Sequence, residues 1–152
     1  MLSISVSLPR GDIEVLVGSD EFNIYCHLNP NYKYYTQNGA RSRDLSFHIL
    51  SARKGSVKTR LDSVILNETS IQATYDPKIV AKDRIECLVE VEGKSRAVCN
   101  QMVKVGYGVQ PPENFTCISE NWQSLNCTWD VPYNPIRTQY ELFFMELGSG
   151  PR

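Results

Sequence analysis

Hydrophobic residues alternate with polar ones along most of the first hundred positions, the period of a β-strand with one buried face. The clearest stretch is Phe22, Ile24, Cys26 and Leu28, which share one parity. Breaks rich in Gly, Pro, Asp or Asn separate such stretches at short intervals. We expect strands near 4–8, 13–17, 22–28, 45–49, 61–66, 71–75, 85–91 and 97–105. This pattern predicts an all-β sandwich.

Two cysteines lie mid-strand on predicted inward faces, Cys26 and Cys87. Their separation is typical of the bridge that joins the two sheets of an immunoglobulin-like sandwich, so we predict that they pair. Chain entropy gives a bridge over so long a loop about 4 kcal/mol. Residues 1–106 are therefore predicted to form an immunoglobulin-like domain, with Phe47 where the core Trp usually lies. The usual tyrosine two residues before the second cysteine is absent, since that residue is Ile85.

The stretch Asn29–Asp44 reads as a polar loop with a cluster of tyrosines, Tyr32, Tyr34 and Tyr35. Two interpretations stay open for the tyrosines. They lie on the sandwich surface, or they belong to a binding surface, where tyrosine is enriched.

The last predicted strand of this domain, 97–105, raises two further questions. Cys99 shares its parity with inward Val103 and Val105, so we expect a buried thiol, with an intermolecular disulfide as the alternative. The same parity places Val98, Asn100 and Met102 outward. Apolar residues on an outer face mark association, so we predict that this face contacts a protein partner, the alternative being packing against a neighbouring domain or loop.

A second unit follows a Gly- and Pro-rich hinge, residues 107–112. Phe115 and Cys117 share one face of a predicted strand, and Cys127 and Trp129 share one face of the next strand, across a polar turn. Two short strands would set the thiols opposite each other, and the Cys117–Cys127 bridge would be worth about 3 kcal/mol. Trp129 is expected to fill a core beside this bridge.

The spacing Cys117, nine residues, Cys127, Thr128, Trp129 resembles the N-terminal half of the class I cytokine-receptor module. Within that family it is most similar to the interleukin-6-type group, which includes the shared signal transducer and the insect Domeless-type receptors. The resemblance implies that 113–152 is the first, truncated part of a fibronectin type III domain. A third strand is expected at 140–144, and an irregular end at 148–152.

The resemblance also implies a function and a set of partners. Such receptors bind a helical cytokine, associate with a co-subunit or a second copy, and signal through bound kinases of the JAK/STAT type. The outer face of the last strand of the first domain is where receptors of this group meet the cytokine. The alternative is an immunoglobulin/fibronectin adhesion or guidance module without a cytokine ligand.

Composition favours an extracellular chain. The formal net charge is −1, which argues against a nucleic-acid or anionic-membrane surface, and no apolar run is long enough to cross a bilayer. Disulfide-type cysteine spacing occurs together with three N-x-S/T sequons. We expect glycans at Asn67 and Asn114, and less complete modification at Asn126, because Cys127 occupies the middle of its sequon.

No residues suggest catalysis, a cofactor or a metal site. Both histidines, His27 and His48, fall on predicted outward faces, and no Cys-x-x-Cys pair or Gly-rich phosphate loop occurs. We therefore expect a binding protein and not an enzyme.

Overall fold

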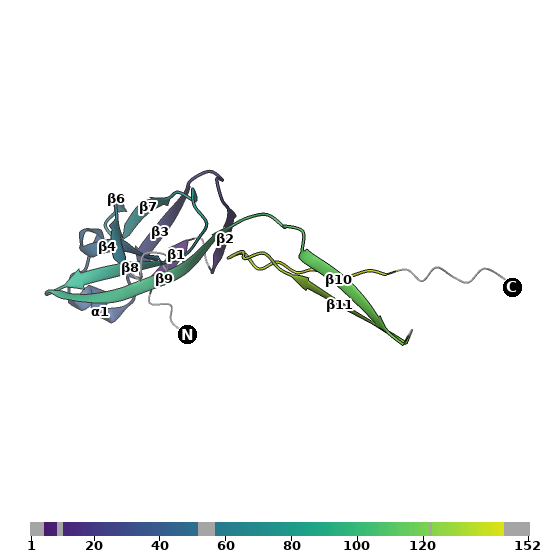
Figure 1. Ribbon diagram of the computed structural model, residues 1–152. Helices are drawn as coiled ribbons and strands as arrows, with labels where there is room; N and C mark the ends of the chain where they lie inside the picture. The colour runs from purple at the N-terminus through teal and green to yellow at the C-terminus, as the bar shows by residue number, and fades with distance from the viewer. Residues whose placement is uncertain (1–4, 9–10, 52–56, 122, 145–152) are drawn as a thin grey trace.

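The computed structural model describes residues 5–8, 11–51, 57–121 and 123–144. The chain is all-β: two sheets face each other in residues 5–106, and a two-stranded hairpin extends away from them (Figure 1). Among the described residues, no helix has the length and apolar character needed to span a membrane.

The first sheet has four strands in the order β1-β3-β7-β6, all antiparallel. β6 forms one of its edges and pairs with β7 alone. The strands are β1 Ser5–Leu8, β3 Phe22–Leu28, β7 Ser70–Tyr75 and β6 Ser63–Asn67.

The second sheet has five strands in the order β2-β9-β8-β4-β5. β2 runs parallel to β9, so the N-terminal part of the chain contributes one strand to each sheet. This division around a two-sheet core is the immunoglobulin-like arrangement. The strands are β2 Ile13–Leu16, β9 Lys94–Gly106, β8 Ala81–Val91, β4 Leu45–Ser51 and β5 Lys58–Leu61.

Alternating side chains from both sheets fill the space between them. The predicted disulfide between Cys26 on β3 and Cys87 on β8 crosses this core, and both residues are buried. Phe47 lies opposite Cys87 on the neighbouring strand β4 and is 2% exposed, so it fills the site that often holds a Trp. The other large apolar members of the core are Ile24, Leu28, Tyr35, Leu45, Ile71, Tyr75, Ile85, Val89, Val98, Val103 and Val105.

The predicted polar loop at 29–44 has more structure than its composition indicated. It contains the short helix α1, Lys33–Gln37, and a 3-10 turn η1, Ser42–Asp44. Tyr35 is buried in the core cluster, and its ring meets Tyr32 edge-on at 4.9 Å between centroids. Arg96 stacks on the ring of Tyr34 at 4.3 Å. Burial is the main cause that raises the pKa of Tyr35. The three tyrosines therefore anchor the loop to the sandwich instead of projecting freely from it.

Two strand predictions need correction. The single strand expected at 61–66 is two strands, because the chain passes from the second sheet to the first at Asp62, between β5 and β6. The third strand expected at 140–144 is absent from the described chain, where 131–144 is irregular. The irregular end expected at 148–152 lies outside the described residues.

The hairpin consists of β10, Glu113–Glu120, and β11, Ser124–Asp130. Cys117 and Cys127 are directly opposite each other and form the second predicted disulfide. Trp129 packs against Phe115 at 6.2 Å between ring centroids, but Phe115 is 48% exposed. Trp129 is half-buried and does not fill a core as expected, because the two-stranded hairpin has no second sheet; the irregular segment that carries Tyr140 and Leu142 lies beside the ring.

A buried polar pair ties the two sheets near one end of the core. The Tyr75 hydroxyl on β7 donates a hydrogen bond to Asp83 Oδ2 on β8 at 2.7 Å, and Asp83 is 7% exposed. Asp83 Oδ1 is buried and has no hydrogen-bond partner among the described residues. Burial, followed by the hydrogen bond to Asp83, raises the pKa of Tyr75, so the hydroxyl stays protonated and able to donate.

Tyr75→Phe should lower the free energy of unfolding by about 1.5–3 kcal/mol, because it leaves a buried carboxylate without its donor. Tyr133→Phe is the matched control, since Tyr133 is 78% exposed and its change should stay within about 0.5 kcal/mol. Urea unfolding followed by intrinsic fluorescence measures both. Equal stability of the two variants would contradict the role of the Tyr75–Asp83 bond.

Candidate functional site

The outer face of the five-stranded sheet is the candidate site. Residues opposite each other in neighbouring strands share a face, so the register defines it. Its members are Glu14 and Leu16 on β2, Ser46, His48 and Leu50 on β4, Lys58 and Arg60 on β5, Lys82, Arg84, Glu86, Leu88 and Glu90 on β8, and Ser95, Ala97, Asn100, Met102 and Lys104 on β9.

Asn100 and Met102 lie on this outer face as predicted, whereas the prediction for Val98 is wrong. Cys87 pairs with Cys99, but Leu88 pairs with Ala97, so Val98 is the extra residue of a β-bulge. The bulge breaks strict alternation, and Val98 turns into the core with 8% of its surface exposed. Counting alternate residues along the sequence cannot detect a bulge of this kind.

Two rows of side chains cross the middle of the face. Met102 is opposite Arg84, which is opposite Leu50 on the next strand. In the adjacent row, Asn100 is opposite Glu86, which is opposite His48. Leu50, His48 and Met102 are half-buried, so the centre of the face is partly apolar while its members remain accessible.

Glu86 holds the charged residues of the face in place. Its Oε2 accepts from Lys58 Nζ at 3.1 Å, and its Oε1 pairs with Arg84 at 2.8 Å. Only 15% of the Glu86 side chain is exposed, against 41% for Lys58 and 49% for Arg84. The half-buried carboxylate thus links β8 to β5 across β4, the strand between them, and leaves the two cations at the surface.

The face carries more basic than acidic groups. Its cations are Lys58, Arg60, Lys82, Arg84 and Lys104, and its anions are Glu14, Glu86 and Glu90. Lys104 on β9 forms ion pairs with two acidic residues in and just before β2. Its Nζ lies 3.0 Å from Glu14 Oε1 and 3.7 Å from Asp12 Oδ2. The hydrogen bond to Glu14 is the main cause that raises the pKa of Lys104.

His48 sits within this basic surrounding. Burial, followed by the charges of Lys58 and Arg60, lowers the pKa of its imidazole. Nδ1 of His48 is buried and has no hydrogen-bond partner among the described residues. The ring is therefore neutral at physiological pH and serves as a mainly apolar surface at the centre of the face.

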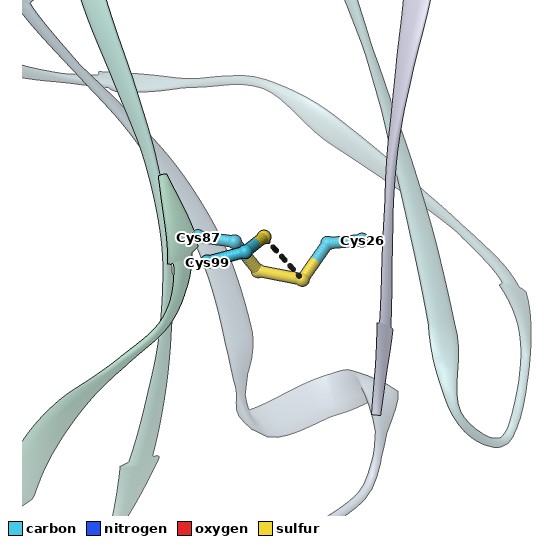
Figure 2. A group of neighbouring side chains, drawn as sticks. All are labelled: Cys26, Cys87 and Cys99. Atoms are coloured by element: carbon cyan, nitrogen blue, oxygen red, sulfur yellow. Dashed lines mark hydrogen bonds between the residues drawn. A yellow bond between two sulfur atoms is a disulfide. The ribbon is translucent and has the colours of Figure 1, made fainter. Parts of the chain in front are cut away.

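The third core cysteine lies beside the inter-sheet bridge, as Figure 2 shows. Cys99 is half-buried and keeps its thiol, with Sγ 3.8 Å from Cys26 Sγ on the opposite sheet. The three sulfur atoms lie within 4.8 Å of one another, but two are joined covalently, so the cluster is a disulfide with a neighbouring thiol. The bulge at Val98 sets Cys99 against Cys87.

The predicted hinge at 107–112 is held by contacts that the sequence did not indicate. The Asn134 side chain accepts from the Tyr107 N–H at 3.1 Å and donates to the Tyr107 carbonyl at 2.8 Å. The Tyr140 hydroxyl donates to the Gln110 carbonyl at 2.6 Å. The segment after β11 therefore returns to the end of β9, as Figure 1 shows, and fixes the elbow between sandwich and hairpin.

The three sequons occupy different surroundings. Asn67 is at the exposed end of edge strand β6. Asn114, on β10, donates from Nδ2 to Asp130 Oδ2 at 2.8 Å. Asn126 is exposed on β11 beside the Cys117–Cys127 bridge. All three asparagines are at the surface.

Comparisons with known proteins leave the family open. No family model matches the chain, and no curated protein matches it. Among solved structures, the crystal structure of the Lin-41 filamin domain is similar at 13% identity and a TM-score of 0.46. The match covers 70% of this chain and 95% of that one, and at this level it carries no argument about function. The immunoglobulin-like fold is evident from the sheet order and the inter-sheet disulfide.

Gly106 is the residue on which the elbow depends. A Cβ at this position would overlap the Asn134 amide oxygen and lie 2.9 Å from Ile136 Cγ1, whereas a Cβ at Gly108 would meet nothing within 4 Å. Gly106→Ala should therefore displace the returning segment and cost about 1–3 kcal/mol of local stability. Hydrogen exchange should then lose protection at the Tyr107 amide.

Gly108→Ala is the matched control for this prediction, because it changes the same hinge without an overlap. Its exchange pattern should follow the parent protein. Unchanged protection at Tyr107 in Gly106→Ala would show that the Asn134 contact does not hold the elbow.

Proposed function

We propose that this chain is an extracellular ligand-recognition segment of a class I cytokine receptor, and that the outer face of the five-stranded sheet binds a helical cytokine. The observation that carries the proposal is a pair of half-buried apolar side chains, Leu50 and Met102, which flank exposed Arg84 in one row and are surrounded by charged groups. A partly apolar centre with a polar rim is the anatomy of a protein interface. The two disulfides are in keeping with an extracellular location.

The dimensions of the face suit a helical partner. Five strands at about 4.8 Å spacing place the outermost strands roughly 19 Å apart. A helix with its side chains is about 10–12 Å across, so one or two helices of a bundle fit across the sheet. Two of the cations on the face, Lys58 and Arg84, are already held by Glu86, so they need little rearrangement to meet such a partner.

Charge narrows the kind of helix that fits. The basic excess of the face favours a partner that presents acidic residues around an apolar stripe. Met102 supports contact with such a stripe, since its flexible side chain adapts to an uneven surface. Neutral His48 extends the apolar centre without adding to the positive charge.

The alternative function is an adhesion or guidance module with the same fold and no cytokine ligand. In that case the same face would pair with a second copy or with another sandwich domain. The two functions differ in the fold of the partner, so a binding screen separates them.

The test is a binding screen of the secreted chain against recombinant helical cytokines from its own organism, using biolayer interferometry. A helical cytokine should bind the parent chain, and Met102→Glu should weaken that binding about 30-fold or more by placing a charge at the apolar centre. Gln72→Glu on the outer face of the other sheet is the matched control and should bind like the parent.

Thermal unfolding of each variant checks that the fold is intact before binding is compared. Binding of a sandwich domain or a second copy, with no response to any helical cytokine, would favour the adhesion function. A folded Met102→Glu variant that binds cytokine as tightly as the parent would overturn the proposed site.

A further inference from the structure

β6 is an edge strand with apolar side chains on both of its faces. Val64, Ile65 and Leu66 are consecutive and are 64%, 57% and 47% exposed. β7 covers one side of the strand, and the other side is the edge of the sheet, at the upper margin of the sandwich in Figure 1. Ile65 is exposed although its partner Ile71 is 1% exposed, so the sheet opposite does not reach this edge.

An exposed apolar edge strand is a template for pairing with another strand, and proteins normally protect it. β6 has the sequence SVILN, with neither a lysine nor a proline. A bulge at Leu66 is one protective feature, since Ile65 pairs with Ile71 but Asn67 pairs with Ser70. The bulge leaves Val64 and Ile65 in regular pairing geometry, so the strand needs a further cover.

The sequon at the end of β6 is held in a defined geometry. Asn67 Oδ1 accepts from the Thr69 backbone N–H at 2.9 Å and from the Thr69 hydroxyl at 3.2 Å. Both bonds use the amide oxygen. Among the residues that the structure describes, none accepts a hydrogen bond from Asn67 Nδ2, so the reactive nitrogen is available at an exposed position.

The other two sequons offer poorer acceptors. Asn114 has a left-handed backbone with a φ of 52°, and its Nδ2 donates a hydrogen bond to Asp130 Oδ2, so this nitrogen is tied to the partner strand, unlike that of Asn67. Asn126 lies opposite Ile118 within the hairpin ladder, and the next residue, Cys127, is in the disulfide. The structure therefore separates Asn67 from Asn114, which the sequence alone ranked together.

We propose that Asn67 carries an N-linked glycan whose function is to cover the apolar edge of β6 and prevent it from pairing with another strand. The donor is a lipid-linked oligosaccharide pyrophosphate. Asn67 Nδ2 forms a bond to the anomeric carbon of the sugar, the bond from that carbon to the pyrophosphate oxygen breaks, and the amide loses one proton. The lipid pyrophosphate is the leaving group. This inference rests on the extracellular location in the proposed function but not on cytokine binding.

The experiment uses the chain secreted from eukaryotic cells that make high-mannose glycans. Glycopeptide mass spectrometry should find Asn67 occupied in most molecules and Asn114 in fewer. Treatment of the folded protein with an endoglycosidase that leaves one N-acetylglucosamine should convert monomer into dimer or larger species at micromolar concentration, as measured by light scattering after size exclusion.

Matched variants separate the glycan from the asparagine. Asn67→Gln and Thr69→Ala should both associate, Thr69→Ser should keep the glycan and stay monomeric, and Asn126→Gln should behave like the parent. Ile65→Lys added to Asn67→Gln should restore the monomer, because a charge on the edge opposes pairing.

Secreted protein with glycans at Asn114 or Asn126 but none at Asn67 would overturn the inference. A trimmed protein or Asn67→Gln variant that stays monomeric would also overturn it. Absence of glycans from all three sequons, with the protein retained inside the cell, would instead contradict the extracellular location. Neither result bears on cytokine binding, which the binding screen tests separately.

Discussion

The Cys26–Cys87 disulfide is the constraint on which the rest of the structure depends. It joins β3 in one sheet to β8 in the other, across a core that contains Phe47, Ile71 and Val89. Closing the 61-residue separation lowers the entropy of the unfolded chain, an effect of roughly 4 kcal/mol. The disulfide fixes which side chains of β8 and β9 point into the core. The side chains that alternate with them therefore face solvent, and these form the candidate binding face.

Much of this arrangement could be predicted from alternation alone. Every second side chain is buried or partly buried in the strands Phe22 to Leu28, Leu45 to Ile49 and Ile85 to Val91. A sheet with one covered face requires apolar residues at these alternate positions. The same parity placed Cys26 and Cys87 inward, and the positions of Asn100 and Met102 on the outer face followed. The local hydrophobic pattern predicts which side chains are buried where the strands are regular and each face of the sheet is either fully covered or fully exposed to solvent.

The sequence was less informative where the structure depends on contacts between distant residues. Val98 enters the core because a bulge adds one residue to β9, and parity does not register such an insertion. Gly106 and Asn134 meet across the elbow although they are far apart in the chain, so neither signals the contact by itself. In the candidate face, the ion pair of Glu86 on β8 with Lys58 on β5 depends on strand order, which alternation does not supply. Tyr35 is buried within a stretch whose polar composition indicated a surface loop.

The most direct test of this account is the disulfide connectivity of the secreted protein. Cys99 makes the test demanding, because its Sγ lies 3.8 Å from Cys26 and its backbone lies opposite Cys87, so exchange would produce a different bridge. Alkylation of free thiols, proteolysis without reduction and mass spectrometry should give the peptides Cys26–Cys87 and Cys117–Cys127, with the alkyl group on Cys99. A Cys87–Cys99 or Cys26–Cys99 peptide as the main species would contradict the account, because the disulfide that joins β3 to β8 across the core would then be absent.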